Sequence, residues 1–141
     1  MKRPVIVFDL DGTLIDTAPD LLDSLNHCLS GTGLPVVDQS DFKRFVGMGG
    51  RVMIERAHAA AQRDLAEAEH ERLLQLFVEH YSSGIPGKSR PYPGVPEAIA
   101  RFEKAGYALA ICTNKYEAHS VALIEGLGLA RHFAAIAGQD T

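Results

Sequence analysis

The chain has 141 residues, 46% of them hydrophobic, which is enough for one ordinary domain or for a core with a small insertion. Its 14 basic and 18 acidic side chains give a net charge of −4 without a basic cluster, which argues against nucleic acid or an anionic membrane as a partner. No apolar run approaches the roughly 20 residues of a membrane span, and the N-terminus lacks the apolar core of a signal peptide. Cys28 and Cys112 lie far apart in apolar surroundings, as buried reduced thiols do, so we expect a cytoplasmic protein.

The first predicted element is a short strand over residues 5–8, Val-Ile-Val-Phe. An apolar run without polar alternation is typical of a strand buried on both faces of a parallel sheet. Asp9 and Asp11 follow, and they would point the same way if the strand continued through them, before Gly12 lets the backbone turn. Two carboxylates at the carboxyl end of a buried strand lie where open α/β sheets bind ligands. The alternative interpretation is a polar turn without a function. The apolar strand before the aspartates and Thr13 after them argue against it.

Residues 17–82 show the periodicity of helices and no convincing strand. An apolar stripe over residues 21–29 predicts one helix, and a similar pattern over residues 65–82 predicts another. The sequence Val-Gly-Met-Gly-Gly-Arg at residues 46–51 interrupts the helical pattern. The proline- and glycine-rich stretch at residues 82–94 then predicts a linker or loop.

The remaining sequence alternates helix and strand. A helix from about Pro96 leads to a second apolar strand over residues 107–112, which ends in Thr113 and Asn114. A helix over about residues 116–127 precedes a third strand, residues 133–137.

This order predicts an α/β fold with an incomplete, Rossmann-like parallel sheet and an inserted helical cap. We assign the core to residues 1–15 and 84–141 and the cap to residues 16–83. Because right-handed crossovers make the first two strands parallel, the loops after both strands would meet at one edge of the sheet.

The polar groups at that edge suit phosphoryl transfer. An aspartate can form an aspartyl-phosphate, and Asp9 and Asp11 provide two carboxylates at the strand end. Oxygen ligands of this kind suit Mg²⁺, and the absence of paired Cys or His argues against zinc. Thr113 and Asn114, just before a helix, can present hydroxyl, amide and backbone N–H groups to a phosphate.

These motifs resemble a known family. The sequence Asp-Leu-Asp-Gly-Thr-Leu-Ile-Asp at residues 9–16 resembles motif I of the haloacid dehalogenase-like hydrolases, and Ile-Cys-Thr-Asn at residues 111–114 looks like their motif II. Thr-Ala-Pro-Asp-Leu at residue 17, Val-Gly-Met-Gly at residue 46 and Pro-Tyr-Pro-Gly-Val at residue 91 are most similar to its phosphoglycolate phosphatase branch.

The resemblance implies a role for each matching residue. Asp9 would be the nucleophile and a Mg²⁺ ligand, and Asp11 would be the general acid and base and a second metal ligand through its backbone carbonyl. Phosphate contacts would come from Leu10, Asp11, Thr113 and Asn114. The implied activity is Mg²⁺-dependent hydrolysis of a small phosphorylated metabolite, similar to phosphoglycolate, through an aspartyl-phosphate intermediate.

Two motifs of the family have no counterpart here, namely the Lys that steadies the nucleophile and the acidic pair that completes the Mg²⁺ site. Lys115 is not a substitute, because it directly follows motif II, and Asp140 does not match the acidic motif. We therefore expect the chain to correspond to the first two-thirds of such a phosphatase, with impaired activity and weak Mg²⁺ affinity. An uncovered sheet edge would also favour self-association.

Several alternatives stay open. Arg51 can pair with a substrate carboxylate or can be a solvated residue at a turn. Lys115 can support the phosphate or contact the substrate, or can be a solvated or capping residue. A phosphomutase or a pyrophosphatase of the same family would share the two aspartates, and a non-catalytic binding or assembly module is a further class.

Overall fold

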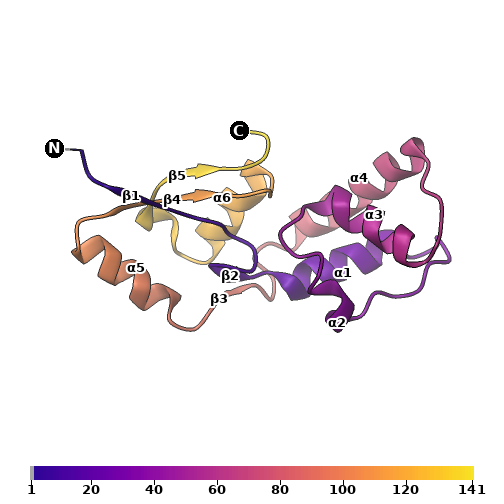
Figure 1. Cartoon of the computed structure of the whole chain (residues 1–141), viewed down its shortest axis with the longest axis horizontal. Helices are drawn as coiled ribbons and strands as arrows, with labels where there is room; N and C mark the ends of the chain where they lie inside the picture. Colours follow the sequence, from indigo (N-terminus) through magenta and orange to yellow (C-terminus); the bar gives the residue numbers. More distant parts are fainter. Residues whose placement is uncertain (1) are drawn as a thin grey trace.

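The computed structural model describes residues 2–141, which form two lobes (Figure 1). One lobe contains the strands β1 (Val5–Phe8), β4 (Ala108–Cys112) and β5 (Phe133–Ala137), the helices α5 (Val95–Lys104) and α6 (Glu117–Gly126), and the 3-10 turn η1 (Ala130–His132). The other lobe contains the helices α1 (Ala18–Leu29), α2 (Gln39–Phe42), α3 (Gly50–Ala60) and α4 (Glu67–Ser83). The short strands β2 (Ile15–Asp16) and β3 (Arg90–Pro91) lie where the lobes join.

The main sheet is parallel, with strand order β1-β4-β5. Phe8 at the end of β1 pairs with Ile111 near the end of β4, so the loops after these strands leave the sheet at the same edge. The predicted α/β class with a parallel sheet is therefore confirmed. The crossover rule is the reason that the sequence order of strands and helices was enough to predict it.

One face of this sheet is open, which corrects the expectation that the first strand is buried on both faces. Val5 and Val7 are 56% and 60% exposed. Helices α5 and α6 both cover the opposite face, where Phe8 contacts Phe102 of α5 and Ile111 packs with Leu123 of α6. Both crossovers run in the same direction across the sheet, and right-handed connections then place both helices on one side.

The two cysteines lie in different environments. Cys28 is buried in the cap, where burial raises the pKa of its thiol to about 12. Cys112 is exposed at the end of β4, so the expectation of two buried thiols is wrong for this residue. Both thiols are free.

Each lobe has its own hydrophobic cluster. In the cap, α1, α3 and α4 pack around fully buried side chains that include Leu25, Ile54 and Leu73. In the core, Leu10 and Ile124 belong to a separate cluster beneath the sheet. Two clusters support the division into a core (1–15 and 84–141) and a cap (16–83), which we keep as a proposal.

The two connections between the lobes are held together. Strands β2 and β3 pair antiparallel, with Ile15 opposite Pro91. Close to this pair, the Asp20 carboxylate accepts hydrogen bonds from the Lys88 N–H at 3.0 Å and from the Ser89 N–H and hydroxyl at 2.8 and 2.6 Å. The predicted proline- and glycine-rich linker is therefore an ordered loop attached to the first cap helix. Among residues 2–141, no helix is both long and apolar enough to cross a membrane.

Candidate active site

The two motif aspartates lie in different environments because the chain leaves the strand before it reaches them. Strand β1 ends at Phe8, and the carbonyl of the fully buried Leu10 accepts the N–H groups of the next turn. Gly12, with φ of 77°, permits that turn. Asp9 is exposed, and its carboxylate accepts the Leu10 N–H at 2.8 Å. Asp11 is turned inward and is only 7% exposed, which an extended chain through both residues would not produce.

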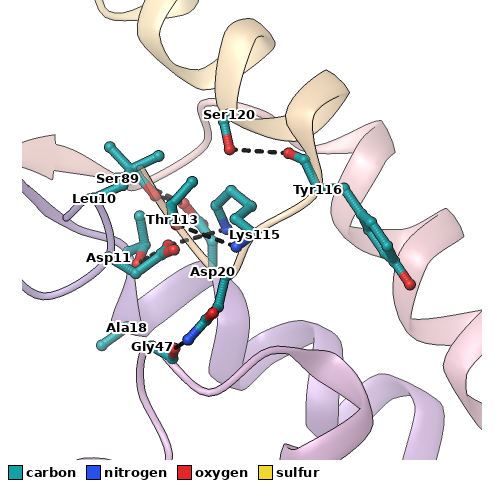
Figure 2. Close-up of polar contacts among 12 residues, drawn as sticks. Leu10, Asp11, Ala18, Asp20, Gly47, Ser89, Thr113, Lys115, Tyr116 and Ser120 are labelled. Atoms are coloured by element: carbon teal, nitrogen blue, oxygen red, sulfur yellow. Dashed lines mark hydrogen bonds and ion pairs between the residues drawn. The ribbon is translucent and has the colours of Figure 1, made fainter. Parts of the chain in front are cut away.

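Asp11 is held by two donors from different parts of the chain, of which Figure 2 labels Lys115. The Thr17 hydroxyl donates to Asp11 Oδ1 at 2.7 Å, and the Lys115 ammonium lies 3.0 Å from the same oxygen. Burial acts to lower the pKa of Lys115, but the Asp11 carboxylate and the neighbouring Tyr81 together outweigh it, so the pKa of Lys115 lies above its usual value. The two side chains therefore form a buried ion pair at the sheet edge.

The residues after β4 have separate tasks. The Thr113 side chain is buried, and its hydroxyl oxygen accepts the Lys115 N–H at 3.1 Å. Asn114 is exposed, and its amide donates to the carbonyl of Gly47 at 3.0 Å (Figure 2). Figure 2 thus shows Asp11, Thr113 and Lys115 close together, whereas Asn114 joins the core to the cap through Gly47.

The glycine-rich loop at residues 46–50 lies directly against the core. Gly47 and Gly49 have φ of 87° and 88°, a conformation that favours glycine. A Cβ atom on Gly47 would lie 3.8 Å from the Asp11 carbonyl oxygen, and one on Gly49 would lie 3.8 Å from that of Asn114. The predicted interruption of the cap helices is therefore the segment that covers the motif loops.

A cavity lies between this loop, the cap helices and the core. Its empty space, including the part that is open to solvent, is about 480 Å³, of which only about 40 Å³ can be reached by the centre of a water-sized sphere. Its polar lining includes Asp11, Asn114 and Lys115 from the core, and its apolar lining comes from the cap side chains Leu21, Met53, Leu74, Phe77, Val78 and Tyr81.

Arg51 does not line this cavity. It belongs to α3 and pairs with two acidic residues of α4, Glu71 and, at 3.6 Å, Glu67. The structure does not support a direct contact between Arg51 and the substrate, and that role stays an untested prediction.

The sequence pattern did not identify two residues of the site. Thr17 lies at the N-cap position of α1, but its side chain makes no capping bond there and donates to Asp11 instead. Tyr81 belongs to the apolar stripe of α4, and the pattern gave it a packing role only. A hydroxyl-bearing side chain within such a stripe is the feature that could have distinguished it.

The site offers a partial set of oxygen ligands. Mg²⁺ is commonly bound through one or two carboxylates together with substrate phosphate and water. The exposed Asp9 carboxylate and the backbone carbonyl of Asp11 fit that pattern, since the Asp11 side chain is already engaged. Within residues 2–141, no group of three or more His, Cys, Asp or Glu side chains is arranged to hold a metal.

Comparison with known proteins gives close relatives. A phosphoglycolate phosphatase of Mesorhizobium japonicum is 78% identical over 141 residues, covering 100% of this chain and 62% of that protein. One of Agrobacterium fabrum is 50% identical over 98% of this chain and 59% of its own length. The chain thus spans about three-fifths of the length of these curated relatives.

The fold comparison agrees. The crystal structure of a predicted phosphoglycolate phosphatase from Haemophilus somnus superposes with a TM-score of 0.85 and 31% identity, covering 96% of this chain and 62% of that one. The sequence model of the family described as haloacid dehalogenase-like hydrolase matches residues 6–141. The chain therefore belongs to the haloacid dehalogenase-like hydrolase family.

Proposed function

We propose that this chain carries the phosphoryl-transfer site of a Mg²⁺-dependent phosphatase for a small phosphomonoester similar to phosphoglycolate. The observation that carries the proposal is the arrangement at the sheet edge. Asp9 is accessible beside a buried cluster in which Asp11 is held by Lys115 and Thr17. The names of the relatives from Mesorhizobium japonicum and Agrobacterium fabrum support the substrate class.

In this proposal the Asp9 carboxylate attacks the phosphorus atom. The bond between phosphorus and the leaving-group oxygen breaks, and Asp11, having taken up a proton, gives it to that oxygen. Asp11 then accepts a proton from a water molecule that attacks the aspartyl-phosphate, which releases phosphate and restores Asp9. Bound Mg²⁺ would neutralise charge on the phosphoryl oxygens.

The other site residues position the phosphate. The backbone of Leu10 and Asp11, the Thr113 hydroxyl and the Asn114 amide are the proposed phosphate contacts. The Lys115 ammonium has N–H groups beyond the one directed at Asp11, and these can donate to a phosphate oxygen. Asn114 also donates to Gly47, so phosphate binding and cap position would be linked.

Phosphate release from 2-phosphoglycolate tests the proposed activity. We expect turnover with Mg²⁺ and a fall of about tenfold or more with EDTA, because the phosphoryl charge is then left uncompensated. The longer Mesorhizobium japonicum relative serves as the positive control, and comparison with it tests the expected impairment. Turnover that requires a sugar bisphosphate would favour a phosphomutase, and turnover unchanged by EDTA would contradict the metal dependence.

We also propose that the open sheet face supports self-association. Val5 and Val7 form an exposed apolar surface on β1, whose outer edge pairs with no other strand among residues 2–141. Exposed apolar surface and unpaired backbone favour association.

Sedimentation velocity tests this second proposal. We expect the chain to form dimers or larger species as its concentration rises, and a Val5→Lys/Val7→Lys variant to remain monomeric. Val36→Lys is the matched control, because Val36 is 81% exposed but belongs to the cap. A chain that is monomeric at every concentration would rule the proposal out.

The free thiols of Cys28 and Cys112 support the expected cytoplasmic location.

A further inference from the structure

The hydroxyl of Tyr81 is a buried polar group without a partner. Tyr81 is only 3% exposed, and its hydroxyl oxygen is the one buried side-chain N or O atom within residues 2–141 that lacks a hydrogen bond. Buried polar groups are nearly always paired, because desolvation is otherwise uncompensated. Tyr81 lines the cavity between cap and core, so its missing partner is expected to be a ligand in that cavity.

The ring that carries this hydroxyl is held in place from several sides. Phe77 stacks nearly parallel to it, with ring centroids 6.3 Å apart and an interplanar angle of 5°. His119 packs edge-on at 5.3 Å, and its Nε2 is already engaged with the Ser82 hydroxyl at 2.6 Å. Because these neighbours fix the ring, the Tyr81 hydroxyl is held at a defined position. A side chain that recognises a ligand needs such a fixed position.

The same ring contacts the ion pair of the proposed active site. The Lys115 ammonium lies 4.3 Å from the Tyr81 ring centroid, within the range of a cation–π interaction. Burial raises the pKa of Tyr81, and the Lys115 ammonium only partly opposes this through its charge and its closeness to the hydroxyl, so the hydroxyl keeps its proton at neutral pH. The two groups are neighbours without a hydrogen bond of good geometry between them. Tyr81 and Lys115 therefore offer two neighbouring hydrogen-bond donors to the cavity.

Two donors beside apolar walls select for a ligand with an anionic oxygen. The walls here come from cap side chains such as Met53, Leu74 and Val78. We propose that the Tyr81 hydroxyl, together with Lys115, binds the carboxylate of the substrate's leaving group and thereby selects phosphorylated hydroxy acids over other phosphomonoesters. The identity of the ligand rests on the proposed function, whereas the unpartnered hydroxyl does not.

Binding of two ligands that differ in one carboxylate tests the inference. 2-Phosphoglycolate and ethyl phosphate share the phosphate and two carbons, and only the first has a carboxylate. Their Kd values are measured by calorimetry with Mg²⁺ in an Asp9→Asn chain, in which hydrolysis does not interfere. We expect Tyr81→Phe to reduce the preference for 2-phosphoglycolate by about tenfold or more, because a hydrogen bond to a charged acceptor is lost.

Tyr107→Phe is the matched control, since it removes a hydroxyl from a residue that does not line the cavity. It should leave the ratio of the two Kd values unchanged. The melting temperature of Tyr81→Phe should equal or exceed that of the Asp9→Asn chain, because no internal hydrogen bond is lost. A lower melting temperature would show that the hydroxyl has an internal partner and would overturn the inference.

The outcomes separate this inference from the proposed function. If Tyr81→Phe weakens both ligands equally, or neither, the carboxylate contact is wrong while the phosphate site stands. If the Asp9→Asn chain binds neither ligand, the phosphate site itself fails, and the carboxylate contact fails with it.

Discussion

Replacing Asp9 by Asn is expected to lower the rate of phosphate release from 2-phosphoglycolate by about a thousandfold or more, as the loss of a covalent nucleophile does in other enzymes. An amide is a far poorer nucleophile than a carboxylate and cannot form the acyl phosphate. Because Asp9 is exposed at the end of β1, the substitution should leave the melting temperature unchanged. The rate and the melting temperature together separate a chemical effect from a loss of folding.

A second measurement addresses the intermediate directly. Rapid quenching in acid followed by mass spectrometry should show the mass of one added phosphoryl group on the parent chain and none on Asp9→Asn. Asp64→Asn makes the same chemical change at an exposed position in the cap and should behave as the parent. A rate for Asp9→Asn within about tenfold of the parent would place the nucleophile elsewhere.

Replacing Lys115 by Met is expected to lower the free energy of unfolding by about 3 kcal/mol or more, because removing one member of a buried ion pair leaves the other charge uncompensated. Lys115 and Asp11 are both more than nine-tenths buried, and their charged atoms lie 3.0 Å apart. Urea denaturation measures the change. Lys104→Met is the matched control, because Lys104 is exposed on α5 and its replacement should change stability little.

The ion pair also predicts a second variant and a pH dependence. Asp11→Asn combined with Lys115→Met should recover part of the lost stability, because no buried charge then remains unpaired.

The pKa of Lys115 is raised in the folded state, so its stabilising contribution is fully present below the unfolded value of about 10.4. This contribution is lost as the pH rises through the higher folded-state pKa. A Lys115→Met chain that loses stability as steeply as the parent in this alkaline range would contradict the assignment.

The order of elements could be predicted because it depends on local pattern. Apolar runs over residues 5–8 and 133–137 gave strands with the bounds that the structure has, and the cap helices differ from their predicted bounds by a few residues. The crossover rule then determined which strand ends meet. The exposure of the strands was predicted less well, because it depends on which face of the sheet the helices cover. An apolar run in the sequence does not indicate that the face carrying Val7 is exposed.

The sequence by itself determined the family, the parallel α/β core with its helical insertion, and the pair of aspartates at the end of the first strand. Each of these follows from residues that are close together in the chain. Only the tertiary structure decided the partners of those residues. It buries Lys115 against Asp11, directs Thr17 to the same oxygen and leaves the Tyr81 hydroxyl unpartnered in the cavity. These contacts join the core to the cap, and their geometry depends on how the two lobes pack, which no local periodicity encodes.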